Sequence, residues 1–378
     1  MSVSLLFEPV RIKGLSLKNR LTMTPLYLGY ANPDGTVSDL MVDHYREMAA
    51  SGVSMVVVEN AAVDVTGLGS PFTLRADQEQ HIAGLARLAQ TINKEGARAF
   101  LQINHAGRYA FGNQRLAPSP FSTGGVVPGE MTEDDIDRMV TAYGEAARRV
   151  KEAGFDGVEI HGGSGYLLVQ FLSPRTNLRK DAYGGGLEAR MRFPLRVVEA
   201  VSAKVGDDFP VGYRFLADEL LPDGLHLEET IPFALELKKR SVAYLSVIAG
   251  TYDSFFLPEY LDMEKREGYM VSYAGAIKKA CPEVPVVAAG RIQTPERAEK
   301  IVQDGEADLI GLARILLADP LWPKKALGVE KEPINPCEPT CSFCMKRAMA
   351  GKPVYCARWA KERREGFLDR VGESRAEN

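Results

Sequence analysis

Short apolar and β-branched runs alternate with longer segments of helical period along most of the chain. Such short runs predict buried strands, and apolar residues that recur at helical spacing predict amphipathic helices. We expect eight strands, at residues 21–25, 55–59, 99–103, 157–160, 211–214, 244–247, 286–289 and 309–311. We expect the helices between them at residues 39–51, 77–95, 132–153, 187–205, 227–240, 272–280 and 295–304.

Eight βα units in succession predict an α/β protein of the (β/α)8 TIM-barrel class. Two helix starts carry clear signals: Thr132 precedes a run of acidic residues in a capping-box pattern, and Thr294 precedes Pro295. Residues 7–18 are expected to form a hairpin across the barrel floor. A doubly wound sheet is the alternative, but it requires an early Gly-x-Gly-x-x-Gly turn, which is not apparent in the sequence.

Composition narrows the function classes. The 378 residues, 45% of them hydrophobic, suffice for one large barrel with an extension. A net charge of -4 with dispersed arginines disfavours nucleic acid as a partner. The absence of a long apolar run and of a signal peptide leads us to expect a soluble, cytoplasmic protein. We expect a barrel at residues 1–330, a four-cysteine extension at 331–360 and a polar tail at 361–378, which Trp359, Phe367 and Leu368 could still pin to the body.

Four of the five cysteines lie close together near the carboxyl end, at Cys337, Cys341, Cys344 and Cys356. This close spacing suits a metal centre, because thiolates from a tight turn and a later turn can converge on one site. Disulfides fit poorly in a chain without a signal peptide. Structural zinc and an iron-sulfur cluster both remain open on the spacing alone. The fifth, Cys281, is expected to be an ordinary buried thiol.

A barrel places its functional residues at the carboxyl ends of the strands, where the βα loops gather. Residues that could take part in binding or catalysis do follow the expected strands. Any one of them reads equally well as a packing or surface residue, but their joint placement favours an active site. In strand order they are Pro25, Leu26 and Tyr27; Asn60; Gln102; His161, Ser164 and Tyr166; Arg214; Tyr252; Gly290 and Arg291; Ala313 and Arg314.

Several of these residues stand in recognisable motifs, including Gln102-Ile-Asn-His-Ala-Gly-Arg108, the run from Tyr166 to Asn177, Ala288-Ala-Gly-Arg291 and Gly311-Leu-Ala-Arg314. Across nearly the whole barrel the chain resembles the old yellow enzyme family of FMN-dependent ene-reductases. The cysteine cluster resembles the branch that contains bacterial 2,4-dienoyl-CoA reductase and trimethylamine dehydrogenase. In that branch a 4Fe-4S centre beside the flavin relays single electrons, so the resemblance favours iron over zinc.

The resemblance implies an FMN site built from the strand ends. Gly290, Arg291, Ala313 and Arg314 would hold the phosphate, because guanidinium groups make charge-assisted bonds to it and glycine allows close backbone approach. Gln102 offers a donor and an acceptor to the flavin edge, and Arg214 would stabilise negative charge near N1. A rim salt bridge is the alternative for Arg291, and a buried ion pair is the alternative for Arg214. Pro25, Leu26, Tyr27 and Asn60 would line the same site.

Catalysis would transfer a hydride from reduced FMN to one alkene carbon and a proton from Tyr166 to the other. His161 would hold the activating carbonyl oxygen of the substrate. Two positions depart from the relatives: Ser164 stands where many carry histidine or asparagine, and Tyr252 stands at or near a catalytic histidine of the dienoyl-CoA reductases. Tyr27 would lie above the flavin. Arg175 would meet an anionic part of the substrate, with a solvated surface role as the alternative.

The clustered relatives continue into a second half that binds FAD and NAD(P)H, and no glycine-rich fingerprint for such a half is seen up to Asn378. One hypothesis is that a separate flavoprotein or ferredoxin feeds electrons to FMN through the cluster. Another is that NAD(P)H reduces FMN directly and that the metal, zinc in this case, is structural. Amine oxidation, a flavin-free barrel lyase and a zinc-regulated binding module are the remaining alternatives, and a homo-oligomer is left open.

Overall fold

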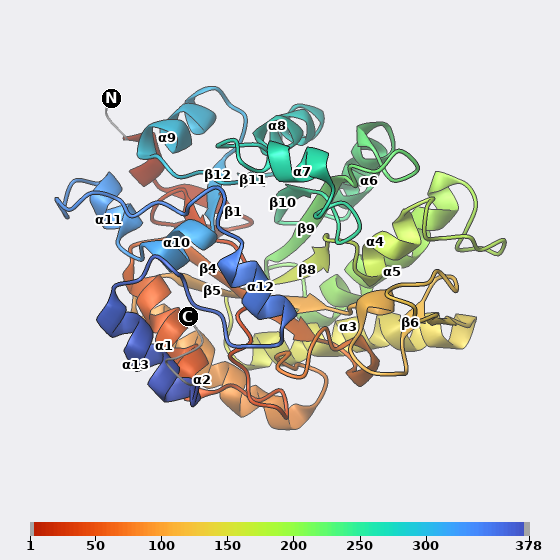
Figure 1. Ribbon diagram of the computed structural model, residues 1–378. Helices are drawn as coiled ribbons and strands as arrows, with labels where there is room; N and C mark the ends of the chain where they lie inside the picture. The colour runs from red at the N-terminus through yellow and green to blue at the C-terminus, as the bar shows by residue number, and fades with distance from the viewer. Residues whose placement is uncertain (1–3, 374–378) are drawn as a thin grey trace.

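The computed structural model describes residues 4–373 as an eight-stranded parallel barrel surrounded by helices (Figure 1). The strands close in the order β10-β11-β12-β3-β4-β5-β8-β9, which confirms the predicted barrel and excludes the doubly wound alternative. Each predicted strand is present. Their bounds are β3 (Leu21–Met23), β4 (Met55–Ala62), β5 (Arg98–Asn104), β8 (Gly157–Gly162), β9 (Val211–Asp218), β10 (Tyr244–Ala249), β11 (Val286–Ala288) and β12 (Leu309–Leu312).

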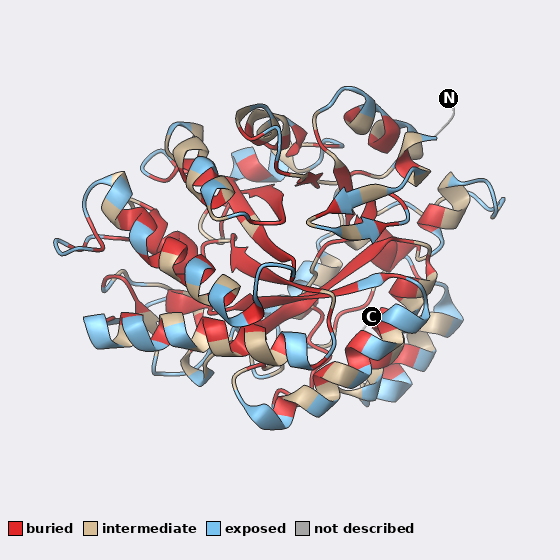
Figure 2. Cartoon of the chain, turned by 180° about the vertical axis from the view of Figure 1, so that it is seen from behind, coloured by how far each residue is buried: buried red, intermediate tan, exposed pale blue. Residues whose placement is uncertain are grey.

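The seven predicted helices cover the barrel, and the strands inside are almost wholly buried (Figure 2). Both predicted caps are confirmed: the Thr132 hydroxyl accepts from the Asp135 amide in a reciprocal capping box, and the Thr294 hydroxyl accepts from Arg297. The helices are α1 (Asp39–Ala50), α2 (Ile82–Lys94), α3 (Glu133–Glu152), α5 (Leu187–Val205), α6 (Leu227–Lys239), α8 (Val271–Ala280) and α9 (Pro295–Gln303).

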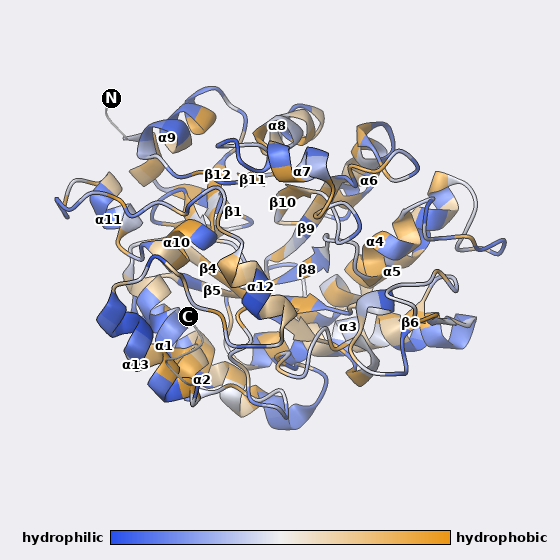
Figure 3. Cartoon of the chain, viewed as in Figure 1, coloured by the Kyte–Doolittle hydropathy of each residue, from blue (hydrophilic) through white to orange (hydrophobic). Residues whose placement is uncertain are grey.

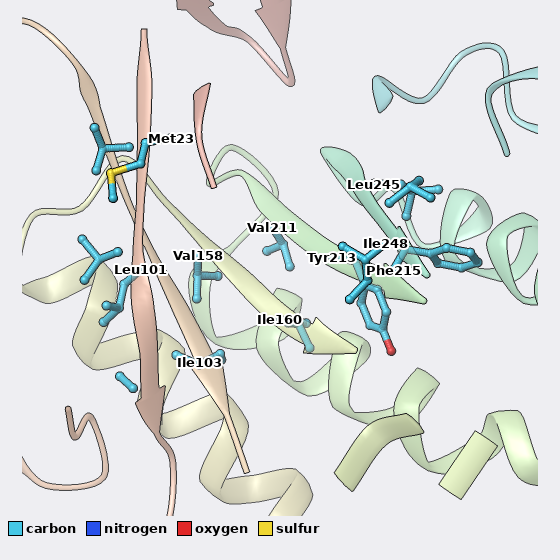
Figure 4. Packing of buried hydrophobic residues seen from close by; sticks show 14 of the residues in the cluster. Met23, Leu101, Ile103, Val158, Ile160, Val211, Tyr213, Phe215, Leu245 and Ile248 are labelled. Atoms are coloured by element: carbon cyan, nitrogen blue, oxygen red, sulfur yellow. The ribbon is translucent and has the colours of Figure 1, made fainter. Parts of the chain in front are cut away.

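The hairpin β1 (Val10–Ile12) and β2 (Leu15–Leu17) closes the amino end of the barrel, as predicted. Ile12 and Leu17 are fully buried against residues that begin the barrel strands, Met55 and Tyr244 among them. Above this floor, the buried side chains drawn in Figure 4, such as Ile103 and Ile160, fill the space between strands and helices. With one end closed by the hairpin, the carboxyl end is left for the functional loops.

The remaining elements were not predicted because each is too short to display a periodic pattern. Most lie in the loops at the carboxyl end or in the cysteine-containing extension. They are the helices α4 (Leu167–Leu172), α7 (Pro258–Met263), α10 (Arg314–Ala318), α11 (Trp322–Ala326) and α12 (Phe343–Met349), the strands β6 (Leu116–Ala117) and β7 (Gly129–Glu130), and the 3-10 turns η1 (Leu5–Phe7), η2 (Val65–Gly67), η3 (Glu79–His81) and η4 (Gly107–Tyr109).

The segment predicted as a polar tail instead begins with the helix α13 (Lys361–Val371), which is mostly hydrophilic in Figure 3 and lies beside α1. Its Phe367 and Leu368 are buried, and the Phe367 ring lies 5.3 Å from that of Tyr355 and 5.8 Å from that of Trp359. Trp359, Phe367 and Leu368 hold this polar segment against the body, as the sequence left open. Residues 374–378, the end of the predicted tail, lie outside the described residues.

Phe367→Ala is expected to destabilise the packing of α13 by about 3 kcal/mol, the usual cost of emptying an aromatic site. Faster amide hydrogen exchange across residues 361–371, with little change in the barrel strands, would measure this loss. Leu321→Ala serves as the control, because the Leu321 side chain is 40% exposed. Equal exchange in both variants would mean that the aromatic pocket does not hold α13.

The cysteine-containing extension docks on the loop that follows β3. The Val354 amide donates to the Leu28 carbonyl at 2.8 Å, and the Tyr30 hydroxyl donates to the Val354 carbonyl. The extension therefore lies over the carboxyl end of the barrel. Within residues 4–373, no helix has the length and apolar character needed to cross a membrane.

Candidate active site

Two tyrosines predicted to face a substrate meet at the carboxyl end of the barrel. Tyr166 stands immediately before α4 in the loop after β8, Tyr252 follows β10, and their hydroxyl oxygens lie 2.8 Å apart. Their loops are joined where the Tyr252 amide donates to the Ser164 carbonyl at 3.2 Å. Ser164 itself has a left-handed backbone (φ 56°), which turns the chain sharply between β8 and Tyr166. The fold thus brings together a pair of phenols that lie far apart in the sequence.

Burial fixes the protonation states of these groups. It raises the pKa of Tyr166 well above the ordinary value, and it also raises the pKa of Tyr252, so both hydroxyls keep their protons at neutral pH. The His161 ring stands perpendicular to that of Tyr166 with centroids 5.0 Å apart. Burial lowers the pKa of His161 to about 3, which keeps the imidazole neutral. Its Nδ1 is buried without a hydrogen-bond partner in the described chain, so it is available to a ligand.

Tyr109 and Asp253 are site residues that sequence reasoning missed. The Tyr109 ring lies 5.1 Å from that of Tyr252, and its hydroxyl donates to Asp253 at 2.6 Å. Arg108 forms an ion pair with the same carboxylate. Burial would raise the pKa of Asp253, but the hydrogen bond from Tyr109 and the charge of Arg108 lower it. The position of Tyr109 directly after the Gln102–Arg108 motif was the one signal that could have identified it. Together these residues hold the loop that carries Tyr252.

Tyr27 lies in the loop after β3, as predicted, and its hydroxyl shares a hydrogen bond with Ser70. Burial raises the pKa of Tyr27 to about 12, so this phenol is also neutral. Pro25 and Leu26 precede it in the same half-buried loop. Asn60 lies in β4 where the register with β5 shifts, and its side chain is buried. These residues share the carboxyl rim with the tyrosine pair.

The two residues predicted for the flavin ring lie inside the barrel around a carboxylate that was not predicted. Gln102 donates from Nε2 to Glu159 at 2.7 Å, and Tyr244 donates to the other oxygen of Glu159 at 2.9 Å. Arg214 donates to the Ser246 hydroxyl at 2.9 Å, and Glu159 supplies the nearby negative charge. Burial raises the pKa of Glu159 and lowers that of Arg214. Glu159 was missed because a mid-strand acid gives no signal until the barrel closes around it.

Arg175 lies at the rim and is linked through Asp253 to the loop that carries Tyr252. Its Nη1 donates to Asp223 at 2.6 Å, and its Nε lies 3.5 Å from Asp253. Asp223 is 61% exposed, so this partner is well solvated. The proposed contact with an anionic part of the substrate stays a prediction.

The residues predicted to hold a phosphate have different surroundings. Gly290 (φ 103°) needs glycine, because an added Cβ would lie 2.9 Å from Met270. Arg291 donates to the carbonyls of Glu264 at 2.6 Å, Cys337 at 3.0 Å and Pro339 at 3.3 Å. Its guanidinium is therefore directed at the cysteine loop.

The second predicted phosphate arginine stands at the start of α10. Ala313 follows β12 at the barrel rim, and Arg314 is the first residue of the helix. The Arg314 guanidinium lies 3.5 Å from the carboxylate of Glu264 and lines the pocket of the cysteines. Arg314 thus stands between the barrel rim and the extension.

Four cysteines line this one small pocket, namely Cys337, Cys341, Cys344 and Cys356. Burial, with a smaller contribution from the neighbouring thiols, raises the pKa of Cys356 to about 11. Cys281 is buried apart from them, as predicted. Among residues 4–373, no three His, Cys, Asp or Glu side chains converge as ligands of a single metal ion. One zinc ion needs all its sulfurs about 2.3 Å away, whereas each thiolate of a cubane binds a different iron and the sulfurs stand farther apart.

A buried acid beneath the Tyr27 loop predicts a measurable pH effect. Burial raises the pKa of Glu59 from 4.5 to about 8, and only its Oε2 has a partner, the Leu28 amide at 2.7 Å. A raised pKa stabilises the folded state at low pH, and this stability is lost as the pH rises from 4.5 through about 8.

Glu59→Gln mimics the protonated acid. Its free energy of unfolding is therefore expected to rise relative to that of the wild type by on the order of 1 kcal/mol per pH unit over this window. Melting temperatures measured from pH 5 to pH 9 would reveal the divergence. The melting temperature of Glu8→Gln, a substitution at an exposed position, should change with pH as that of the wild type does. Parallel curves for Glu59→Gln as well would mean that Glu59 is already ionised at pH 5.

Comparisons with known proteins agree with this architecture. A model of the NADH:flavin oxidoreductase / NADH oxidase family matches residues 5–331. The NADH oxidase of Thermoanaerobacter brockii is 41% identical over 341 residues, which cover 88% of this chain and 52% of the oxidase. The NADPH dehydrogenase of Geobacillus sp. (strain WCH70) is 37% identical over 327 residues, which cover 85% of this chain and 94% of the dehydrogenase.

A solved structure of 2-naphthoyl-CoA reductase with 2-naphthoyl-CoA superposes with a TM-score of 0.90 at 30% identity. The match covers 94% of this chain and 57% of the reductase. The chain therefore spans about half the length of the oxidase and the reductase, and nearly the whole length of the NADPH dehydrogenase.

Proposed function

Because the chain belongs to the NADH:flavin oxidoreductase / NADH oxidase family, we propose that it binds FMN and reduces a carbon–carbon double bond activated by a carbonyl group. The observation that carries this proposal is the pair of buried, protonated phenols beside a neutral His161 with an unpartnered Nδ1. A proton donor and an oxygen-binding group placed side by side are what the reduction of an enone or a thioester enoyl group requires.

The residues present fit FMN. Gln102 and Arg214 would meet the flavin ring from inside the barrel, and Arg314 at the rim would meet the phosphate, with Pro25, Leu26, Tyr27, Asn60, Gly290 and Ala313 lining the site. His161, with its orphaned nitrogen, is the clearest sign of a ligand that completes the site. FMN, when bound, supplies the hydride that adds to one carbon of the alkene.

The protein's own residues would handle the proton. Tyr166 would donate its phenolic proton to the other alkene carbon, and Tyr252, 2.8 Å away, would donate to the Tyr166 oxygen as the negative charge develops there. Burial makes a lasting tyrosinate costly, which favours rapid return of a proton from solvent through Tyr252. His161 would hold the carbonyl oxygen of the substrate as a neutral imidazole, and Tyr27, Ser164 and Arg175 would contact the rest of the substrate.

The four cysteines line one pocket, and we propose that they hold an iron-sulfur cluster, with structural zinc as the alternative. A 4Fe-4S cluster, when bound, exchanges single electrons with a redox partner. We propose that electrons arrive from NAD(P)H or from a separate reduced flavoprotein or ferredoxin. For the substrate, the likeness to 2-naphthoyl-CoA reductase supports an α,β-unsaturated acyl-CoA thioester over a simple enone.

Anaerobically purified protein would test the proposal. The expected results are flavin absorption bands, roughly four irons per chain, and turnover of unsaturated acyl-CoA thioesters with a chemical electron donor. Simple enones and amines would be screened in parallel, and turnover of amines alone would replace ene-reduction with amine oxidation. Rapid bleaching of FMN by NAD(P)H alone would remove the need for a separate protein donor.

A further inference from the structure

We propose that Arg291 positions the cysteine loop and that its positive charge, with that of Arg314 and against the negative charge of Glu264, raises the reduction potential of the metal centre. This inference rests on the proposed iron-sulfur cluster and goes beyond it, because it assigns Arg291 to the cluster rather than to a phosphate. The motif Ala288-Ala-Gly-Arg291 predicted a phosphate ligand at this position, and the hydrogen bonds of the guanidinium point elsewhere.

The guanidinium is nearly inaccessible, with a side chain 2% exposed, and each of its three nitrogens donates to a backbone carbonyl. Two of these carbonyls belong to Cys337 and Pro339, and the third belongs to Glu264. The backbone of Arg291 is left-handed (φ 54°), directly after Gly290. A non-glycine residue held in this region is uncommon and calls for an explanation in the surrounding structure.

These contacts hold the turn that presents two of the four thiols. The turn from Cys337 to Cys341 is closed by the Cys341 amide, which donates to the Glu338 carbonyl at 3.1 Å. Arg291 binds the carbonyls at the start of this turn, so one rigid, planar group fixes its distance from β11. A lysine could keep the charge but could not hold three separate carbonyls in the same fork.

The charged side chains around the pocket of the four cysteines favour the reduced state of the proposed cluster. Arg291 and Arg314 contribute two positive charges, and the Glu264 carboxylate, 4.0 Å from one and 3.5 Å from the other, contributes a single negative charge. Arg358 and Glu338, which also line the pocket, carry opposite charges, and Arg314 would in addition meet the FMN phosphate. Arg291 is therefore the cation of this set that is committed to the cysteine loop. Reduction of the cluster by one electron adds one negative charge without making or breaking a bond at these residues. Cations close by stabilise that state, and net charge and hydrogen bonding are known determinants of cluster potential.

The test is a redox titration of the anaerobic, cluster-loaded protein, followed by electron paramagnetic resonance with dithionite and mediators as the electron source. Arg291→Met is expected to lower the midpoint potential by about 59 mV, a tenfold change in the one-electron equilibrium constant. Glu264→Gln keeps its backbone carbonyl and is expected to raise the potential by a similar amount. Opposite shifts from two neighbouring substitutions would not arise from general structural damage.

Two further variants separate position from charge. Arg291→Lys is expected to keep a potential near that of the wild type but to lose iron faster to a chelator, because the carbonyl fork is gone. Arg87→Gln, in an exposed ion pair with Asp39, should change neither quantity.

Unchanged potentials in Arg291→Met and Glu264→Gln, with the cluster intact, would overturn the inference while leaving the proposed function standing. If Arg291→Met loses FMN but keeps the wild-type iron content and midpoint potential, Arg291 binds the FMN phosphate, as the sequence predicted. Zinc in place of iron in the wild type would overturn both the inference and the proposed cluster.

Discussion

Tyr166→Phe is expected to lower the turnover number for alkene reduction by about 10²–10⁴-fold, the usual contribution of a positioned general acid. The variant keeps the ring that stands perpendicular to that of His161 and removes only the hydroxyl, which lies 2.8 Å from the Tyr252 hydroxyl. Since the phenol acts only when the substrate is reduced, the reduction of FMN by its electron donor should proceed at the wild-type rate. Stopped-flow measurement of the two half-reactions separates these steps.

Tyr252→Phe is the matched control, because it removes the other hydroxyl of the same pair. It should slow substrate reduction less than Tyr166→Phe does, since Tyr252 would act through the Tyr166 oxygen. The reverse order would make Tyr252 the proton donor and Tyr166 its partner. Equal and small effects in both variants would move the proton source to solvent or to His161.

Cys344→Ser is expected to abolish the iron-sulfur centre, with iron falling from roughly four atoms per chain to near zero. Cys344 lies in α12 and lines the pocket with the other three cysteines, so one lost thiolate leaves one iron without its protein ligand. FMN should remain bound, because the barrel strands that would hold it are untouched. Iron analysis and the visible spectrum of anaerobic protein measure both cofactors at once.

Cys281→Ser provides the control for this substitution. Cys281 is fully buried in the barrel core, away from the pocket, so its replacement should leave the iron content unchanged. Retention of full iron in Cys344→Ser would mean that the four cysteines do not hold the cluster. Stoichiometric zinc in the wild type, lost in Cys344→Ser, would make the centre a structural staple.

The barrel could be predicted from the sequence because its evidence is local. The strands are short runs of mostly apolar residues that are largely buried, and cap residues such as Thr132 and Thr294 mark helix starts within one turn. The rim residues followed, since a parallel barrel gathers the carboxyl ends of its strands. Tyr166 and Tyr252 were thus expected at one rim, and the structure brings their hydroxyls into contact.

What could not be predicted depends on partners that are remote in the sequence. Tyr109 donates a hydrogen bond to Asp253, 144 positions away in the sequence. Glu159 accepts hydrogen bonds from Gln102 and Tyr244 on other strands. The direction of the Arg291 side chain is set by a left-handed backbone and by carbonyls of the extension. No local pattern encodes such pairings, because they exist only once the chain has closed on itself.

The hydrogen bond from Val354 to Leu28 bears on how the molecule unfolds. It joins the extension, two residues before Cys356, to the loop that carries Tyr27, and that loop in turn rests on Glu59. A chain cut after residue 330 would leave the Leu28 carbonyl without this partner and Tyr30 without the Phe367 ring, whose centroid lies 5.8 Å away. The boundary expected at residue 330 therefore separates two sequence motifs but not two independently folding units. Release of the metal should increase the mobility of the loop that carries Tyr27.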